Sequence, residues 1–143
     1  MMELVRQKQR KPGVSPVVPN ETYAMIADVL AGKTMTELSA NRANAAAETA
    51  QELMGLMEQG VGTSSINANF LIMQIMDIYE SGNTDMAQQA EGYFEDLLNY
   101  GLNLDSLNVT ALKGSLASIT DKKCKMQAEA FADRLLEKAD KTF

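Results

Sequence analysis

The stretch from Phe70 to Tyr79, FLIMQIMDIY, constrains the fold of this chain more than any other feature. Eight of its ten side chains are apolar, and only Gln74 and Asp77 interrupt the run. A helix that is apolar nearly all round must be buried on more than one side. The segment is therefore either the centre of a helical core or a docking face for a partner, and the amphipathic segments on both sides favour the core.

The rest of the chain predicts helices joined by short turns. Its 143 residues, 45% of them hydrophobic, suit one domain with a single ordinary core. We expect helices over residues 21–31, 35–59, 66–80, 85–99 and 108–141, with Gly114 and the pair Thr120 and Asp121 as the places where the last one kinks or divides. Neither β-alternation of any length nor an internal repeat at a fixed spacing is apparent. The predicted fold is all-α, a single-domain antiparallel helical bundle of five or six helices over residues 20–143.

Capping residues set these expected limits. Asn20 is expected to cap the first helix, and Gly32 to end it. Thr34 and Glu37 match a capping box, which predicts that a second helix begins there. Later helices are expected to begin after Thr63, Ser64 or Ser65, after Asn83 or Thr84, and after Asn108, with Gly101 ending the helix before the last.

Residues 1–19 differ in composition from the rest. Arg6, Lys8, Arg10 and Lys11 are followed by three prolines within eight residues. Each proline ring fixes φ and removes a backbone donor, so the segment predicts a flexible, extended arm outside the domain. Both a solvated tail and an arm ordered by a partner fit this composition.

The net charge of −6 is distributed unevenly. The stretch between Thr34 and Leu107 has eleven carboxylates and a single cation, Arg42. Residues 108–143 have seven cations and five acids. The last helix could therefore lie favourably against the acidic middle, in its own chain or in a neighbour. A duplex-binding domain needs clustered Lys and Arg, so no nucleic-acid partner is expected.

The residue inventory removes several kinds of chemistry. The chain has no His, and its one cysteine, Cys124, has no second Cys with which to form a disulfide or a metal pair. Histidine bases, His-ligated zinc and Ser–His or Cys–His nucleophiles are thereby excluded. The glycines do not form a phosphate loop, and nineteen scattered acids single out no catalytic pair. We expect no catalytic, cofactor or metal site, no small-molecule substrate, and a structural thiol at Cys124.

The N-terminus lacks the apolar region of a cleaved secretory signal. No run approaches the roughly 18 apolar residues that a membrane span requires. A protein that is cytoplasmic as synthesised is expected, and export by a route without a cleaved signal stays open.

The C-terminal forty residues, from Leu104 to Phe143, read LDSLNVTALKGSLASITDKKCKMQAEAFADRLLEKADKTF. A turn, a Leu-Lys pair, a small residue and a further Leu precede a long polar amphipathic helix. This pattern resembles the terminal helices of tip and filament proteins of bacterial type III secretion systems. The chain departs from that class by being short. The resemblance implies an accessory, regulator or exported component of a secretion apparatus.

Protein–protein interaction is the function that these features favour, without catalysis. The alternative is a structural subunit of a phage or virus particle, in which the basic arm reaches across acidic neighbours during assembly. The side chains expected to bind a protein partner, or a second copy of the chain, lie on the apolar segment and the last helix: Phe70, Leu71, Met73, Ile75, Met76, Tyr79, Phe131 and Leu135.

Overall fold

A computed structural model describes residues 20–143, which form six helices and no strand. The helices are α2 (Asn20–Ser39), α3 (Ala43–Glu58), α4 (Ala68–Glu80), α5 (Thr84–Asn99), α6 (Val109–Ser118) and α7 (Lys122–Ala139). The all-α prediction is confirmed. The expected Pro-rich arm, residues 1–19, lies outside the described residues.

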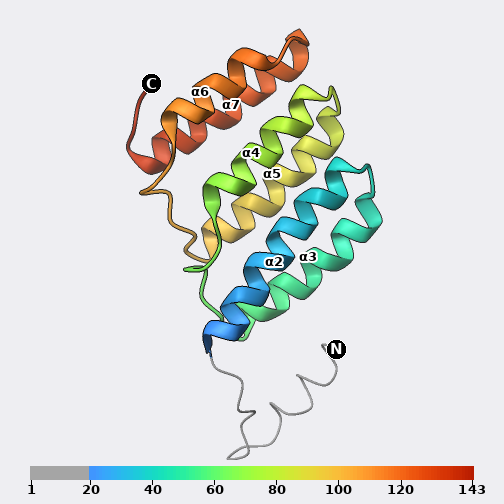
Figure 1. Ribbon diagram of the computed structural model, residues 1–143, viewed down its shortest axis with the longest axis vertical. Helices are drawn as coiled ribbons and strands as arrows, with labels where there is room; N and C mark the ends of the chain where they lie inside the picture. Colours follow the sequence, from blue (N-terminus) through green and yellow to red (C-terminus); the bar gives the residue numbers. More distant parts are fainter. Residues whose placement is uncertain (1–19) are drawn as a thin grey trace, which may run out of the picture.

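Successive helices pair into three antiparallel hairpins that stack side by side (Figure 1). We call them hairpin 1 (α2 and α3), hairpin 2 (α4 and α5) and hairpin 3 (α6 and α7). Hairpin 2 lies between the other two, because α4 contacts α2 on one side and both α6 and α7 on the other. One continuous apolar core joins all three, and its largest fully buried side chains include Tyr79, Phe94 and Phe131.

From hairpin 1 through hairpin 2 to the start of α6, the backbone repeats at a constant spacing that the sequence did not reveal. Gly60 and Gly101 both have positive φ, and their amides donate to Met57 and Leu98. We call the spacing between these two glycines the repeat spacing. Four other pairs of amides at the same spacing make equivalent bonds: Val61 and Leu102, Ile66 and Leu107, Leu71 and Leu112, and Asn41 and Gly82.

This regularity shows that the expectation of no internal repeat was wrong. The chain is a short solenoid of helical hairpins, in which each unit buries its apolar face against its neighbour. Side chains between hairpins follow the same spacing. The Asn67 amide donates to Asp28 Oδ1 at 3.2 Å, and the Asn108 amide donates to Asn69 Oδ1 at 2.8 Å. Both donors are the N-cap residues of the next hairpin, and both acceptors lie on the first helix of the preceding one, so these bonds fix the register of each hairpin.

The predicted boundary at Gly32 was wrong. Helix α2 continues through Gly32 to Ser39, and the chain turns at residues 40–42, where Asn41 has φ 62°. Thr34 is buried and donates to the Leu30 carbonyl at 2.8 Å, so it caps nothing. Glu37 instead accepts from Thr49 of α3 at 2.6 Å. The residue types matched a capping box, but tertiary packing kept this stretch helical.

Other expected boundaries are confirmed. Asn83 and Asn108 cap α5 and α6 with their side chains, and Gly101 follows α5 with φ 101°. The last helical region divides at residues 119–121, where Asp121 caps α7, whereas α6 continues as a helix through Gly114. Asn67, rather than Thr63, Ser64 or Ser65, caps α4. Among the six helices of residues 20–143, none is long and apolar enough to cross a membrane.

Candidate protein-docking surface

The structure buries most of the side chains predicted to bind a partner. Leu71, Ile75, Met76, Tyr79, Phe131 and Leu135 are all core residues. Phe70 is 54% exposed, and Met73 is partly buried against the core. A partner of the folded chain can therefore contact Phe70 and part of Met73, whereas the other six side chains hold the hairpins together.

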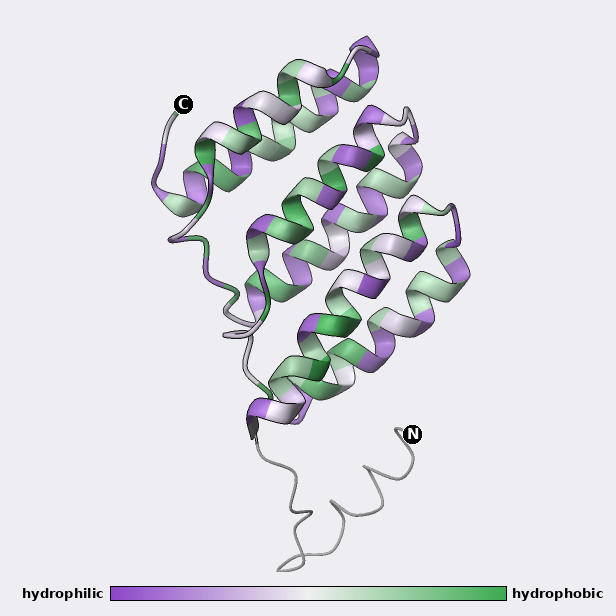
Figure 2. Ribbon diagram, in the orientation of Figure 1, coloured by the Kyte–Doolittle hydropathy of each residue, from purple (hydrophilic) through white to green (hydrophobic). Residues whose placement is uncertain are grey.

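Phe70 lies beside a second group of exposed apolar side chains on α2. A Cβ built at Gly32 would lie 3.6 Å from Phe70 Cε2, so the ring covers the glycine. Val29 and Met25 precede Gly32 at helical spacing on the same side, and they are 65% and 63% exposed. We call Met25, Val29, Phe70 and Met73 the apolar stripe. Figure 2 shows hydrophobic residues on the N-terminal half of α2 as well as on α4.

The repeat explains why the stripe crosses from one hairpin to the next. Val29 and Phe70 are separated by the repeat spacing and occupy equivalent positions on α2 and α4. The spacing of Met25 and Val29 within the expected helix 21–31 already places them on one face. Sequence reasoning took them for apolar packing contacts of that helix, and the structure leaves them 63% and 65% exposed.

Carboxylates outnumber cations around the stripe. Asp77 and Glu80 are exposed on α4, and Asp28 is partly exposed on α2. The nearby cation Lys33 is 3.9 Å from Glu37 on its own helix. The stripe is thus an apolar surface with an acidic border, which favours contact with a partner that has apolar and basic side chains.

A buried polar cluster joins hairpins 2 and 3. Glu91 of α5 is 8% exposed; it accepts from the Tyr79 hydroxyl of α4 through Oε2 and from Arg134 Nη2 of α7 through Oε1, the latter at 2.6 Å. The Arg134 guanidinium also lies 5.7 Å from the centre of the Phe131 ring, and that ring meets Phe94 edge to face at 6.0 Å. The cluster therefore ties three helices together through one carboxylate.

Burial governs the protonation of this cluster. It raises the pKa of Tyr79, and the hydrogen bond to Glu91 raises it further. It also raises the pKa of Glu91, whereas the bonds from Tyr79 and Arg134 oppose that rise. Both shifts are what desolvation of an acid predicts. Because the carboxylate is occupied by two donors from its own chain, the cluster fits a structural role.

Cys124 lies in the first turn of α7 and is buried. Burial raises the pKa of its thiol, and the neighbouring Asp121 adds to the rise. The Asp121 side chain accepts from the Cys124 amide at 2.8 Å, and that bond lowers the pKa of the carboxyl. A thiol that is buried and kept protonated packs as a small apolar group.

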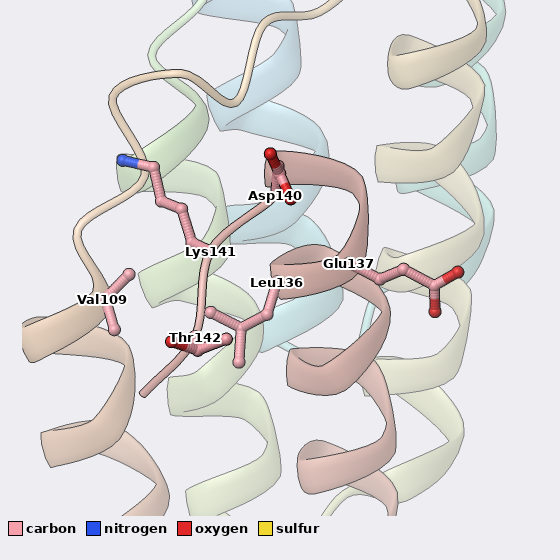
Figure 3. A pocket seen from close by; sticks show the side chains of 6 residues that line it. All are labelled: Val109, Leu136, Glu137, Asp140, Lys141 and Thr142. Carbon is pink, nitrogen blue, oxygen red and sulfur yellow. The ribbon is translucent and has the colours of Figure 1, made fainter.

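Two grooves lie at the ends of the hairpins. The first, of about 490 Å³, is lined by Val109, Leu136, Glu137, Asp140, Lys141 and Thr142 (Figure 3). The Lys141 and Glu137 side chains point away from each other there, and Leu136 supplies an apolar wall. The second, of about 730 Å³, runs between the loops that precede α4 and α6. Within residues 20–143, no three His, Cys, Asp or Glu side chains gather as a metal site would require.

Comparisons with known proteins find no match for this chain. No family model, no curated protein and no solved structure is significantly similar to it.

Proposed function

We propose that this protein acts by binding another protein on the apolar stripe, without catalysis. The carrying observation is that Phe70 stays 54% exposed although the next two side chains of α4, Leu71 and Ile72, are buried. Stacked hairpins present an extended surface that recurs from unit to unit, and repeat proteins use such surfaces for binding. Exposed large apolar side chains on neighbouring helices add a reason to expect a partner.

The border of the stripe indicates the chemistry of that partner. Asp77 and Glu80 continue along α4 beyond Phe70 and Met73. A partner segment with an apolar side chain beside Phe70 and Lys or Arg near the C-terminal end of α4 would complement this surface. The finer predictions, a component of a secretion apparatus or a virion subunit, stay predictions, because no similar protein was found.

A photo-crosslinking amino acid at position 70 tests the proposal in the cells that make the protein. The matched control carries it at position 126, because Met126 is 62% exposed but lies on α7 in hairpin 3. We expect a discrete protein adduct from position 70 and none of the same mass from position 126.

Binding of the crosslinked protein is then measured with purified components. Phe70→Glu is expected to weaken binding at least about tenfold, because it places a charge in an apolar contact. Met126→Glu should leave binding unchanged, and circular dichroism should show both variants fully helical. Equal binding by the wild-type protein and Phe70→Glu would rule out the stripe as the docking surface.

A further inference from the structure

The repeat shows which edge of each hairpin meets the hairpin before it. Three residues of α4 and its N-cap contact α2 in this way. Asn67 and Gln74 donate hydrogen bonds to Asp28 and Thr36. The Phe70 ring covers Gly32. In hairpin 3, Asn108 contacts Asn69 of α4 at the equivalent positions, and Ser115, the equivalent of Gln74, contacts Met73, the equivalent of Gly32. The contact edge is thus a repeated feature of the fold.

Hairpin 1 leaves the corresponding edge open. One repeat spacing before Asn67, Phe70 and Gln74 lie Ile26, Val29 and Lys33. Within the described residues no hairpin precedes α2, and Ile26 and Val29 are 37% and 65% exposed. We call Ile26, Val29 and Lys33 the open edge.

At the opposite end of the stack, the outer face of α6 is polar. The residues of α6 equivalent to Asp28, Gly32 and Thr36 are Thr110, Gly114 and Ser118. All three are exposed, and none has a large apolar side chain. A polar outer face of this kind is what the terminal unit of a solenoid requires. The N-terminal end lacks such a face and exposes branched apolar side chains instead.

We infer that residues 1–19 of the same chain bind the open edge and complete the stack. They join the chain directly at Asn20, the first residue of α2. Lys33, the far end of the open edge, lies in the C-terminal half of that helix, about 20 Å from its start along the axis. About six extended residues span this length, so the segment is long enough to run back along the whole edge.

The composition of the segment matches the surface of hairpin 1. Val14, Val17 and Val18 can cover Ile26 and Val29 with apolar area. Residues 1–19 have four cationic side chains and one carboxylate, whereas residues 20–58 have six carboxylates and two cations. The segment and hairpin 1 therefore have opposite net charges, which favours contact between them.

The size of the open edge favours a tethered segment over a second copy. A stable interface between proteins buries on the order of 1,200 Å² or more, which two apolar side chains and one lysine cannot supply. A segment of the same chain is present at an effective concentration on the order of millimolar, so a small contact suffices. The inference does not depend on the identity of an external partner, although Val29 belongs to both surfaces.

A paramagnetic label on the full chain tests the contact. The label is attached at Ser15→Cys, and the native Cys124 is buried and so does not react under folding conditions. We expect loss of the Ile26 and Val29 methyl NMR signals. The Met126 methyl signal should stay sharp, because that side chain is exposed in hairpin 3. Unchanged Ile26 and Val29 signals would overturn the inference.

Two further samples separate the remaining outcomes. Mixing spin-labelled chains with isotope-labelled chains should give no broadening; broadening in the mixture would assign the edge to a second copy and overturn the inference. Val29→Glu in the full chain should restore the Ile26 signal, whereas the matched variant Met126→Glu should not. Because Val29 is exposed, both variants should keep the helical circular dichroism of the parent.

Discussion

Hairpins 1 and 2 share a backbone plan but differ in what their equivalent positions hold. Hairpin 1 has Leu38, Ala50 and Leu53 where hairpin 2, one repeat spacing later, has Tyr79, Glu91 and Phe94, and all six are buried. Three apolar side chains are enough for the packing of hairpin 1 on hairpin 2. The polar and aromatic side chains of hairpin 2 lie where Arg134 and Phe131 of α7 pack against it. The comparison indicates that the polar cluster serves the docking of hairpin 3 and is not needed to form a hairpin.

The largest expected effect comes from Phe94→Ala, compared with Leu53→Ala at the equivalent position. Both side chains are fully buried, so each truncation leaves a cavity. We expect losses in the free energy of unfolding of about 4 kcal/mol for Phe94→Ala and about 3 kcal/mol for Leu53→Ala, measured by urea denaturation. Hydrogen exchange should show faster opening of α7 with Phe94→Ala than with Leu53→Ala, because Phe94 packs on Phe131 of that helix. Equal exchange in α7 for the two variants would show that Phe94 does not serve the docking of hairpin 3.

Removing the cation from the cluster should have the next largest effect. Arg134→Met keeps the aliphatic stem but leaves the buried Glu91 carboxylate without its ion pair. We expect a loss of about 2 kcal/mol at pH 7, reduced from the value for a fully buried pair because the Arg134 side chain is 45% exposed. Adding Glu91→Gln should recover part of the loss, since a neutral amide needs no cation.

The pH dependence of Arg134→Met follows from the direction of the Glu91 shift. The folded-state pKa of Glu91 is raised, so its contribution to stability is greatest below the pKa of the unfolded chain and declines as pH rises. Without Arg134, the guanidinium that opposes this rise is lost. The loss relative to wild type should therefore be smaller at about pH 4 than at pH 7. A loss independent of pH would show that Glu91 is not the affected group.

Tyr79→Phe tests the third member of the cluster. The substitution removes one of the two donors to the buried Glu91 carboxylate, so we expect a loss of about 1.5 kcal/mol at pH 7. The folded protein holds the Tyr79 proton more tightly than the unfolded chain does because its pKa is raised, so wild-type stability should fall as pH rises above about 10. Tyr79→Phe should show a shallower fall in alkaline urea titrations. Identical alkaline slopes would contradict a raised pKa at Tyr79.

The sequence predicted the helical class and the boundaries set by strong local signals. The helix caps Asn83 and Asn108 and the left-handed turn at Gly101 lie where the sequence predicted them. Such features were predictable because they depend on a few neighbouring atoms. Gly32 misled because a glycine inside a helix looks like a terminator until Phe70, distant in sequence, is seen to cover it. The repeat escaped notice for a similar reason. Its equivalent positions share backbone bonds and burial while the side chains differ, as at Ala50 and Glu91.

The turns inside hairpins 1 and 2 offer a direct test of their equivalence, and Gly82→Asn is the variant with the smallest expected effect. Asn41 and Gly82 occupy the same position, with φ 62° and 89°, and their amides donate to Leu38 and Tyr79 respectively. Asparagine tolerates the left-handed conformation better than other residues with a side chain. We therefore expect Gly82→Asn to lower the free energy of unfolding by less than about 0.5 kcal/mol, and Gly82→Val by about 1 to 2 kcal/mol. Open space surrounds a Cβ at Gly82, so the difference between the two variants would measure backbone conformation alone. Equal losses for Asn and Val would mean that the two turns are not equivalent, and that the repeat of backbone bonds does not extend to the energetics of the fold.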